Sequence, residues 1–405
     1  MRDASAAHGG HRRFGAARST LFAYGFRPFF LLAGVFAVLA VPLWLTMYAV
    51  GTNPLPGLPA QYWHAHEMVF GLVPAAIAGF LLTAVPSWTG ARGFAGRPLM
   101  LLCAAWLAGR VAFAAAPVLA QWLVALAELM FLPALAALLA PPLVRARNRN
   151  TPLLAVITLL WCCDAVFLLG WALLTPLLAF RALRVGIDVI LTLITVIGGR
   201  IVPSFTANAL RRRGQAVDIG QRTWLEKLVV PAMIVMTAVD AWLPDSTLSG
   251  YVAVVVAAAQ ALRLLGWRAI RTRGDAILWV LHLGYAWLPI GFALKALWLL
   301  RGVPWAAYWL HALTAGAIAT MILAVMSRVA LGHTGRELHV KGSIAAAYLT
   351  LSGAALLRVF GPALAPSRSL PVLAISGALW TVAFAIYLIV YAPILTSPRV
   401  DGKAG

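Results

Sequence analysis

Two histidines and a glutamate stand together in the segment YWHAHEMVFG, residues 62–71, where a long uncharged apolar run begins. Ionisable side chains at the edge of such a run are costly to keep there and usually serve a function. A neutral imidazole carries a lone pair that suits iron, copper or zinc. His64 and His66 are therefore candidate metal ligands. Glu67 beside them could deliver protons to a reacting group or orient one of the imidazoles.

The spacing of the two histidines limits what one helix can do with them. Residues two apart on a helix point about 200° apart, so His64 and His66 cannot both face one metal if both are helical. Either His64 lies in a lead-in turn, or the two histidines serve different sites. One stripe of the helix has small residues below a polar end, and it contains His64, Glu67, Gly71, Ala75 and Ala78. The small residues would leave room for a flat macrocycle, or equally for close packing of another helix.

A weak internal repeat connects this segment with a second histidine. Residues 66–90 align without gaps on residues 311–335, with five identities that include His66 with His311. Parallel repeats of this kind are related by an axis along the membrane normal. The two aligned histidines would then face each other at matched depth. Such a pair could supply opposed ligands to one haem iron or share a copper ion.

Three further residues are candidates for holding a cofactor. His282 and His333 lie deeper toward the opposite side and could bind a second metal, although His333 could instead cap its helix end. Arg200, in the motif GGRIVPSFT, could bind a carboxylate such as a haem propionate, or its side chain could extend to the membrane interface. Because the sequence has no C-x-x-C-H motif, any haem would be held without covalent attachment, as haem b is.

The elements that position these residues are transmembrane helices. The chain has 405 residues, of which 62% are hydrophobic and 11% charged, far from the composition of an ordinary soluble protein. A membrane-spanning helix needs roughly 20 apolar residues. The sequence predicts an all-α bundle of about twelve spans in one domain, residues 28–395, between tails at 1–27 and 396–405. The spans are expected at 28–50, 67–88, 98–116, 118–142, 152–175, 182–208, 227–244, 250–269, 276–300, 305–331, 342–362 and 371–395.

The net charge of +20 follows the predicted topology. If the termini and the loops between even and odd spans share one side, that side holds 22 Lys and Arg and the other holds five. This asymmetry is the positive-inside pattern, so we expect both termini in the cytoplasm and no nucleic-acid partner. The partner implied instead is a lipid bilayer. On this topology His64, His66, Glu67 and His311 lie in the outer half of the membrane.

Four motifs in this order resemble the NnrS family over nearly the whole chain: GFRPFFLLAG (25–34), WHAHEMVFG (63–71), GGRIVPSFT (198–206) and HALTAGAIATMILAVMSRVALGHTGR (311–336). The resemblance implies a multi-pass protein of the bacterial inner membrane that carries haem and copper and is linked to denitrification and to nitric oxide resistance under nitrosative stress. It makes His64, His66 and His311 the first ligand candidates, with His282 and His333 next. It does not divide them between iron and copper.

The function that the resemblance implies is binding and detoxification of nitric oxide at haem, with copper as a second cofactor. Reduction would require electrons, and the sequence contains no covalent haem site, iron–sulphur cysteine spacing or nucleotide-binding fingerprint. Quinol or another external donor would have to supply them, so an oxidoreductase and a binding protein both stay open. The alternative from another class is a secondary transporter of a small molecule or metal, with its polar site in the outer half of the bundle.

Overall fold

A computed structural model of the chain describes residues 20–215, 219 and 222–402. These residues form helices and loops without a strand, which confirms the predicted all-α class. The helices are α2 (Phe26–Val50), α3 (Gln61–His66), η1 (Glu67–Leu72), α4 (Val73–Thr89), α5 (Arg97–Ala114), α6 (Gln121–Leu129), α7 (Phe131–Arg145), α8 (Leu153–Ala172), α9 (Pro176–Arg212), α10 (Thr223–Trp242), α11 (Thr247–Gly266), η2 (Ala269–Thr272), α12 (Ala276–Arg301), η3 (Pro304–Ala306), α13 (Trp309–His311), η4 (Ala312–Ile318), α14 (Ala319–His333), α15 (Gly342–Leu364), η5 (Pro366–Arg368) and α16 (Ser369–Thr396).

Helical segments occupy all twelve places at which the sequence predicts a span. Within the described residues, eleven of them are long and apolar enough to cross a membrane. The twelfth segment, α10, has 20 residues and carries Glu226, Lys227 and Asp240. The fold is therefore the expected multi-pass helical bundle.

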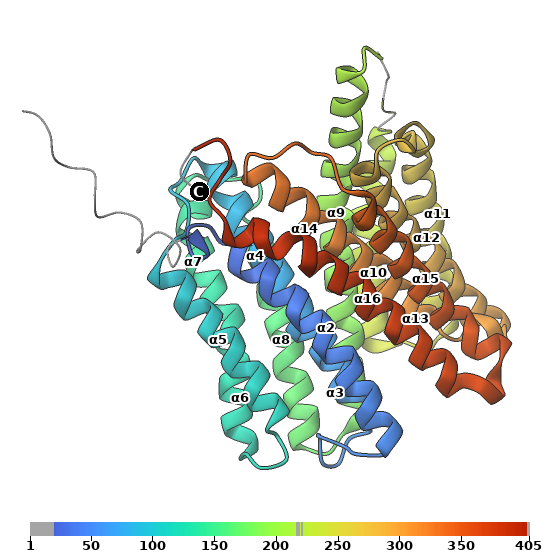
Figure 1. The fold of residues 1–405 in the computed structure, drawn as a ribbon. Helices are drawn as coiled ribbons and strands as arrows, with labels where there is room; N and C mark the ends of the chain where they lie inside the picture. The colour runs from blue at the N-terminus through green and yellow to red at the C-terminus, as the bar shows by residue number, and fades with distance from the viewer. Residues whose placement is uncertain (1–19, 216–218, 220–221, 403–405) are drawn as a thin grey trace, which may run out of the picture.

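The first and last helices of the bundle pack against each other. Arg27 at the start of α2 donates hydrogen bonds to the carbonyl oxygens of Leu395 and Ser397, at 2.9 and 2.7 Å. Near the middle of the same contact, the indole nitrogen of Trp380 donates to the carbonyl of Ala37 at 3.0 Å. In Figure 1, α5, α6 and α7 lie to one side of this pair and α10, α11 and α12 to the other.

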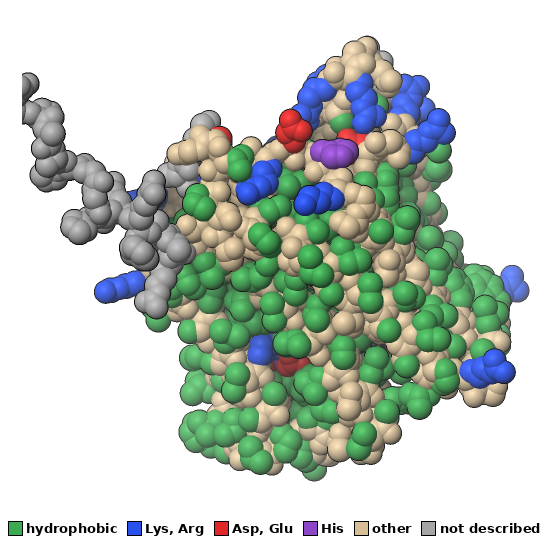
Figure 2. Space-filling model, in the orientation of Figure 1, with side chains coloured by type: hydrophobic (Ala, Val, Ile, Leu, Met, Phe, Trp, Pro, Cys, Tyr) green, Lys and Arg blue, Asp and Glu red, His purple; other side chains and the backbone are tan. Residues whose placement is uncertain are grey.

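The surface repeats the charge asymmetry of the sequence. Figure 2 shows Lys and Arg side chains gathered at the end of the molecule where α9 projects, and mainly hydrophobic side chains over the rest of this face. Which end faces the cytoplasm stays a prediction. Residues 1–19 and 403–405, which include most of the first predicted tail and the end of the second, lie outside the described residues.

Candidate functional site

Two of the spans contain a π-helical turn directly after a histidine. In one span α3 ends at His66 and the π-helix η1 follows, and in the other α13 ends at His311 and the π-helix η4 follows. These are the two segments that the sequence repeat aligns, histidine on histidine. A π-helical turn accommodates one extra residue within a helix and is frequently found at functional sites. The shared turn supports the relation between the two segments.

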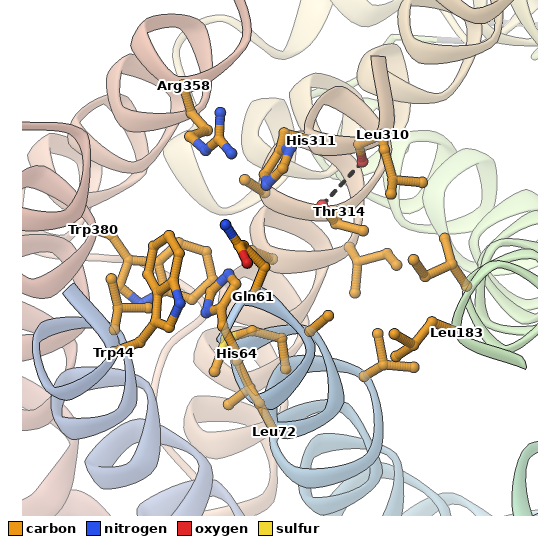
Figure 3. Close-up of a pocket in the computed structure, with 18 of the residues that line it drawn as sticks. Trp44, Gln61, His64, Leu72, Leu183, Leu310, His311, Thr314, Arg358 and Trp380 are labelled. Carbon is orange, nitrogen blue, oxygen red and sulfur yellow. Dashed lines mark hydrogen bonds between the residues drawn. The ribbon is translucent and has the colours of Figure 1, made fainter. Parts of the chain in front are cut away.

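The histidines that lie in one cavity are His64 and His311. They line a cavity of about 290 Å³, together with Trp44, Gln61, Thr314 and Arg358, and its walls are otherwise mainly apolar. Figure 3 shows His64 coming from α3 and His311 from the far side of the cavity, with Arg358 beside His311. Side chains about 250 positions apart in the chain therefore meet around one space.

The imidazole of His64 is held in place, but one of its nitrogens has no partner. Its ring stacks on Trp44, with ring centroids 4.1 Å apart and planes 24° apart. The Nδ1 atom is buried and has no hydrogen-bond partner among the described residues. Buried polar atoms are nearly always paired in proteins, so this nitrogen of a cavity-lining histidine could bind a ligand.

Arg358 brings a positive charge to the same cavity without a carboxylate to balance it. It comes from α15, its guanidinium lies 5.3 Å from the ring centroid of Tyr308, and it has no ion-pair partner among the described residues. The other arginine of the cavity wall, Arg184, is paired with Asp245 at 2.7 Å. An unpaired arginine in an apolar cavity suits a ligand that carries a carboxylate or another anion.

His66 does not line this cavity, although it is only two residues from His64. Its Nε2 lies 2.9 Å from Oδ1 of Asp164, and its ring stacks on Phe113 with centroids 3.9 Å apart. His64 lies in helix α3 with His66 rather than in a lead-in turn, and the two rings face different surroundings, so that they serve different sites stays a prediction. The structure thus brings together two of the three predicted metal ligands.

Glu67 also faces away from the cavity, into a buried ionic cluster. Its Oε1 lies 2.8 Å from Nη1 of Arg110, whose Nη2 pairs with Glu128. The predicted stripe of small residues below His64 is interrupted by the π-turn, and the cavity is lined instead by positions spaced by four, such as His64, Met68 and Leu72. Proton delivery by Glu67 stays a prediction, and its route would begin in this cluster.

Gly71 makes room for the cluster, and this role can be tested. A Cβ atom at Gly71 would collide with the Arg110 guanidinium and lie 3.1 Å from a ring atom of Phe36. We expect Gly71→Ala to lower the free energy of unfolding by about 1–3 kcal/mol, measured by thermal unfolding in detergent. The control is Gly353→Ala in α15, where a Cβ has no neighbour within 4 Å. Equal stability of the two variants would contradict this role.

The remaining candidates lie elsewhere in the described structure. His282 Nε2 lies 2.9 Å from the hydroxyl of Thr206, and His333 packs against Tyr24 at the end of α14. Arg200 is exposed and donates to the side chain of Asn150 at 2.7 Å. None of the three lines the cavity that contains His64 and His311.

Sequence reasoning missed Trp44, Gln61 and Arg358 as cavity residues. In the charge pattern of the sequence, Arg358 is one of the five basic residues on the predicted outer side. Its depth, close to that of His64 and His311 under the same topology, was the one signal that could have drawn attention to it. A tryptophan or glutamine at the edge of a span carries no comparable signal.

The comparison with protein families agrees with this reading of the motifs. A family model described as NnrS protein matches residues 20–399. The chain belongs to the NnrS family. A comparison with curated proteins found no match. Since the NnrS match includes both histidine segments and α15, the cavity and the ionic cluster both lie within the family's matched region.

Proposed function

We propose that this NnrS-family protein holds haem b in the cavity between His64 and His311 and binds nitric oxide there. The observation that carries the proposal is that two imidazoles from distant spans line one mainly apolar cavity, one of them with a buried, unpartnered nitrogen. A ferrous haem held there would supply the binding of nitric oxide, and the residues around it would decide whether the gas is stored, passed on or reduced.

The residues present fit such a group in three respects. The cavity walls are mainly apolar, as the faces of a porphyrin require, and about 290 Å³ is near the lower end of the volumes found for ligand sites. His64 or His311 would hold the haem through an imidazole nitrogen. Arg358 would pair with a propionate carboxylate, which replaces the ion-pair partner that it lacks among the described residues.

The chain's own residues give the cavity its other properties. Trp44 stacks on His64 and fixes the plane of the imidazole. The apolar walls exclude water, and nitric oxide reaches them through the bilayer because it is neutral and apolar. With the termini in the cytoplasm, the cavity lies toward the outer face of a bacterial inner membrane. Detoxification by reduction would take electrons from quinol or another external donor.

The absorption spectrum of the purified protein tests the proposal. We expect a Soret band from non-covalent haem in the wild type and a shifted band when nitric oxide is added to the dithionite-reduced protein. A secondary transporter that uses the same cavity would show no Soret band. Consumption of nitric oxide by quinol-reduced protein without oxygen would identify an enzyme, whereas stoichiometric binding without consumption would identify a binding protein.

Arg358 gives a second test. A hydrogen bond to a charged group contributes about 1.5–3 kcal/mol, so we expect Arg358→Gln to weaken haem retention by about 10- to 100-fold. Haem dissociation into an apomyoglobin scavenger measures this change. The control is Arg301→Gln at the exposed end of α12. If haem dissociates from Arg358→Gln at the wild-type rate, Arg358 does not pair with a haem propionate.

A further inference from the structure

We infer that His66, Glu67 and Glu128 form a separate site for one divalent transition-metal ion. One imidazole nitrogen and two carboxylate oxygens of these residues lie within 4.8 Å of one another, and all three residues are buried. The residues come from α3, η1 and α6 and face away from the cavity of His64 and His311. Imidazole with carboxylate oxygens is a donor set that binds transition metals.

His66 is oriented as a metal ligand is. An ionised Asp164 accepts the Nε2–H of His66 at 2.9 Å, so a neutral His66 has its lone pair on Nδ1. The His66 side chain is 0% exposed. Its Nδ1 atom has no hydrogen-bond partner among the described residues and lies 3.7 Å from Oε1 of Glu67. Metal-bound histidines typically donate their other ring N–H to a carboxylate in this way.

The charges of the cluster leave room for one divalent cation. Glu67, Glu128 and Asp164 carry three formal negative charges, and Arg110 carries one positive charge. The three acidic residues are 1%, 4% and 3% exposed, so water does little to stabilise the excess. Buried charges require compensation, and with a neutral His66 imidazole the surplus of two equals the charge of one divalent ion, whereas a proton on His66 would compensate only one of the two.

Arg110 does not use up the ligand atoms. It contacts Oε1 of Glu67 and Oε2 of Glu128, while Oε1 of Glu128 is buried and has no partner. Gly109 lies beside this carboxylate, where a Cβ would be 3.1 Å from Oε2, so the absence of a side chain there leaves space for Glu128. The guanidinium therefore leaves Oε1 of Glu128 to the ion, which would share Oε1 of Glu67 with Arg110.

The expected ion and the experiment follow from this donor set. Copper(II) binds nitrogen and oxygen sites most tightly among the divalent first-row metals, and zinc(II) binds less tightly. Full-length protein in detergent, treated with chelator, is titrated with copper(II) and separately with zinc(II). We expect one copper(II) per chain, with pulsed electron paramagnetic resonance showing one coordinated imidazole nitrogen, and competition by zinc(II).

Three variants locate the site. We expect His66→Ala to weaken copper(II) binding by more than about 100-fold, and Asp164→Asn, which removes the orienting carboxylate, by about 10- to 100-fold. Glu128→Gln, nearly equal in shape, should weaken it to a similar extent. His282→Ala, which removes a buried histidine of the other half of the bundle, should bind copper(II) as the wild type does. Thermal unfolding of each variant confirms that it is folded.

The inference fails if the wild type takes up neither ion, or if His66→Ala binds copper(II) as tightly as the wild type. If His66→Ala does not fold, a wild-type copper spectrum without a coordinated imidazole nitrogen also overturns it. The site shares no ligand with the proposed haem cavity, so a Soret band recorded on the same samples separates its failure from that of the haem proposal.

Discussion

Replacing both His64 and His311 by alanine is expected to remove haem from the protein, with a haem-to-protein ratio at least about tenfold below that of the wild type. The reason is that these imidazoles are the histidine nitrogens that line the cavity. Haem content per chain, from the pyridine haemochromogen spectrum and protein quantification, measures the effect. Each single variant should fall between the double variant and the wild type.

The controls for this experiment are two buried histidines that do not line the cavity, His66 and His282. His66→Ala should retain haem because His66 bonds to Asp164 outside the cavity, and His282→Ala should retain it because His282 bonds to Thr206. His66→Ala should lose the second metal instead. Full haem in the His64→Ala/His311→Ala variant would contradict the assignment of these two histidines as haem ligands. Loss of haem from His66→Ala alone would instead identify His66 as the ligand.

The fold was predictable from the sequence because the membrane imposes it. A run of roughly 20 apolar residues must satisfy its backbone within one helix, so hydropathy alone located the eleven candidate spans of the described residues. The limits of that rule are visible at α10, where Glu226, Lys227 and Asp240 interrupt the apolar run. Their partners, Arg263 for Glu226 and Lys295 for Asp240, come from other helices and leave no local trace in the sequence.

The composition of the site was predictable only in part, because it depends on a local change in helix geometry. Helical wheels with 3.6 residues per turn put His64 and Glu67 on one stripe. The π-turn η1 changes the spacing just beyond His66, so that the carboxylate of Glu67 meets Arg110 while His64 faces the cavity. No residue type in the segment predicts a π-turn. The repeat aligned His66 with His311, whereas the cavity pairs His311 with His64.

Sequence spacing likewise does not predict ion pairs between different helices. Arg184 and Asp188, four residues apart, suit a pair on one helix face. In the structure Arg184 instead bonds Asp245 at 2.7 Å and lies 3.8 Å from Asp240. Asp240 also pairs with Lys295. Tertiary neighbours at the same depth offered better geometry than the local partner did.

Removing the guanidinium of Arg110 is expected to cause a large loss of stability of the bundle. Arg110→Leu would leave Glu67 and Glu128 buried without the cation that contacts both, and breaking a buried pair in this way costs about 3–5 kcal/mol. Unfolding of metal-free protein by heat or by SDS titration measures the change. Metal-free protein is used because a bound ion would offset part of the loss.

Two comparisons decide whether charge is the cause. Arg200→Leu removes an exposed arginine that bonds only Asn150 among the described residues, and it should change the free energy of unfolding by less than about 1 kcal/mol. Adding Glu67→Gln and Glu128→Gln to Arg110→Leu removes the unpaired charges and should restore part of the stability, because neutral amides are less costly to bury than carboxylates. If the triple variant is no more stable than Arg110→Leu, the loss comes from packing around the arginine stem rather than from uncompensated charge.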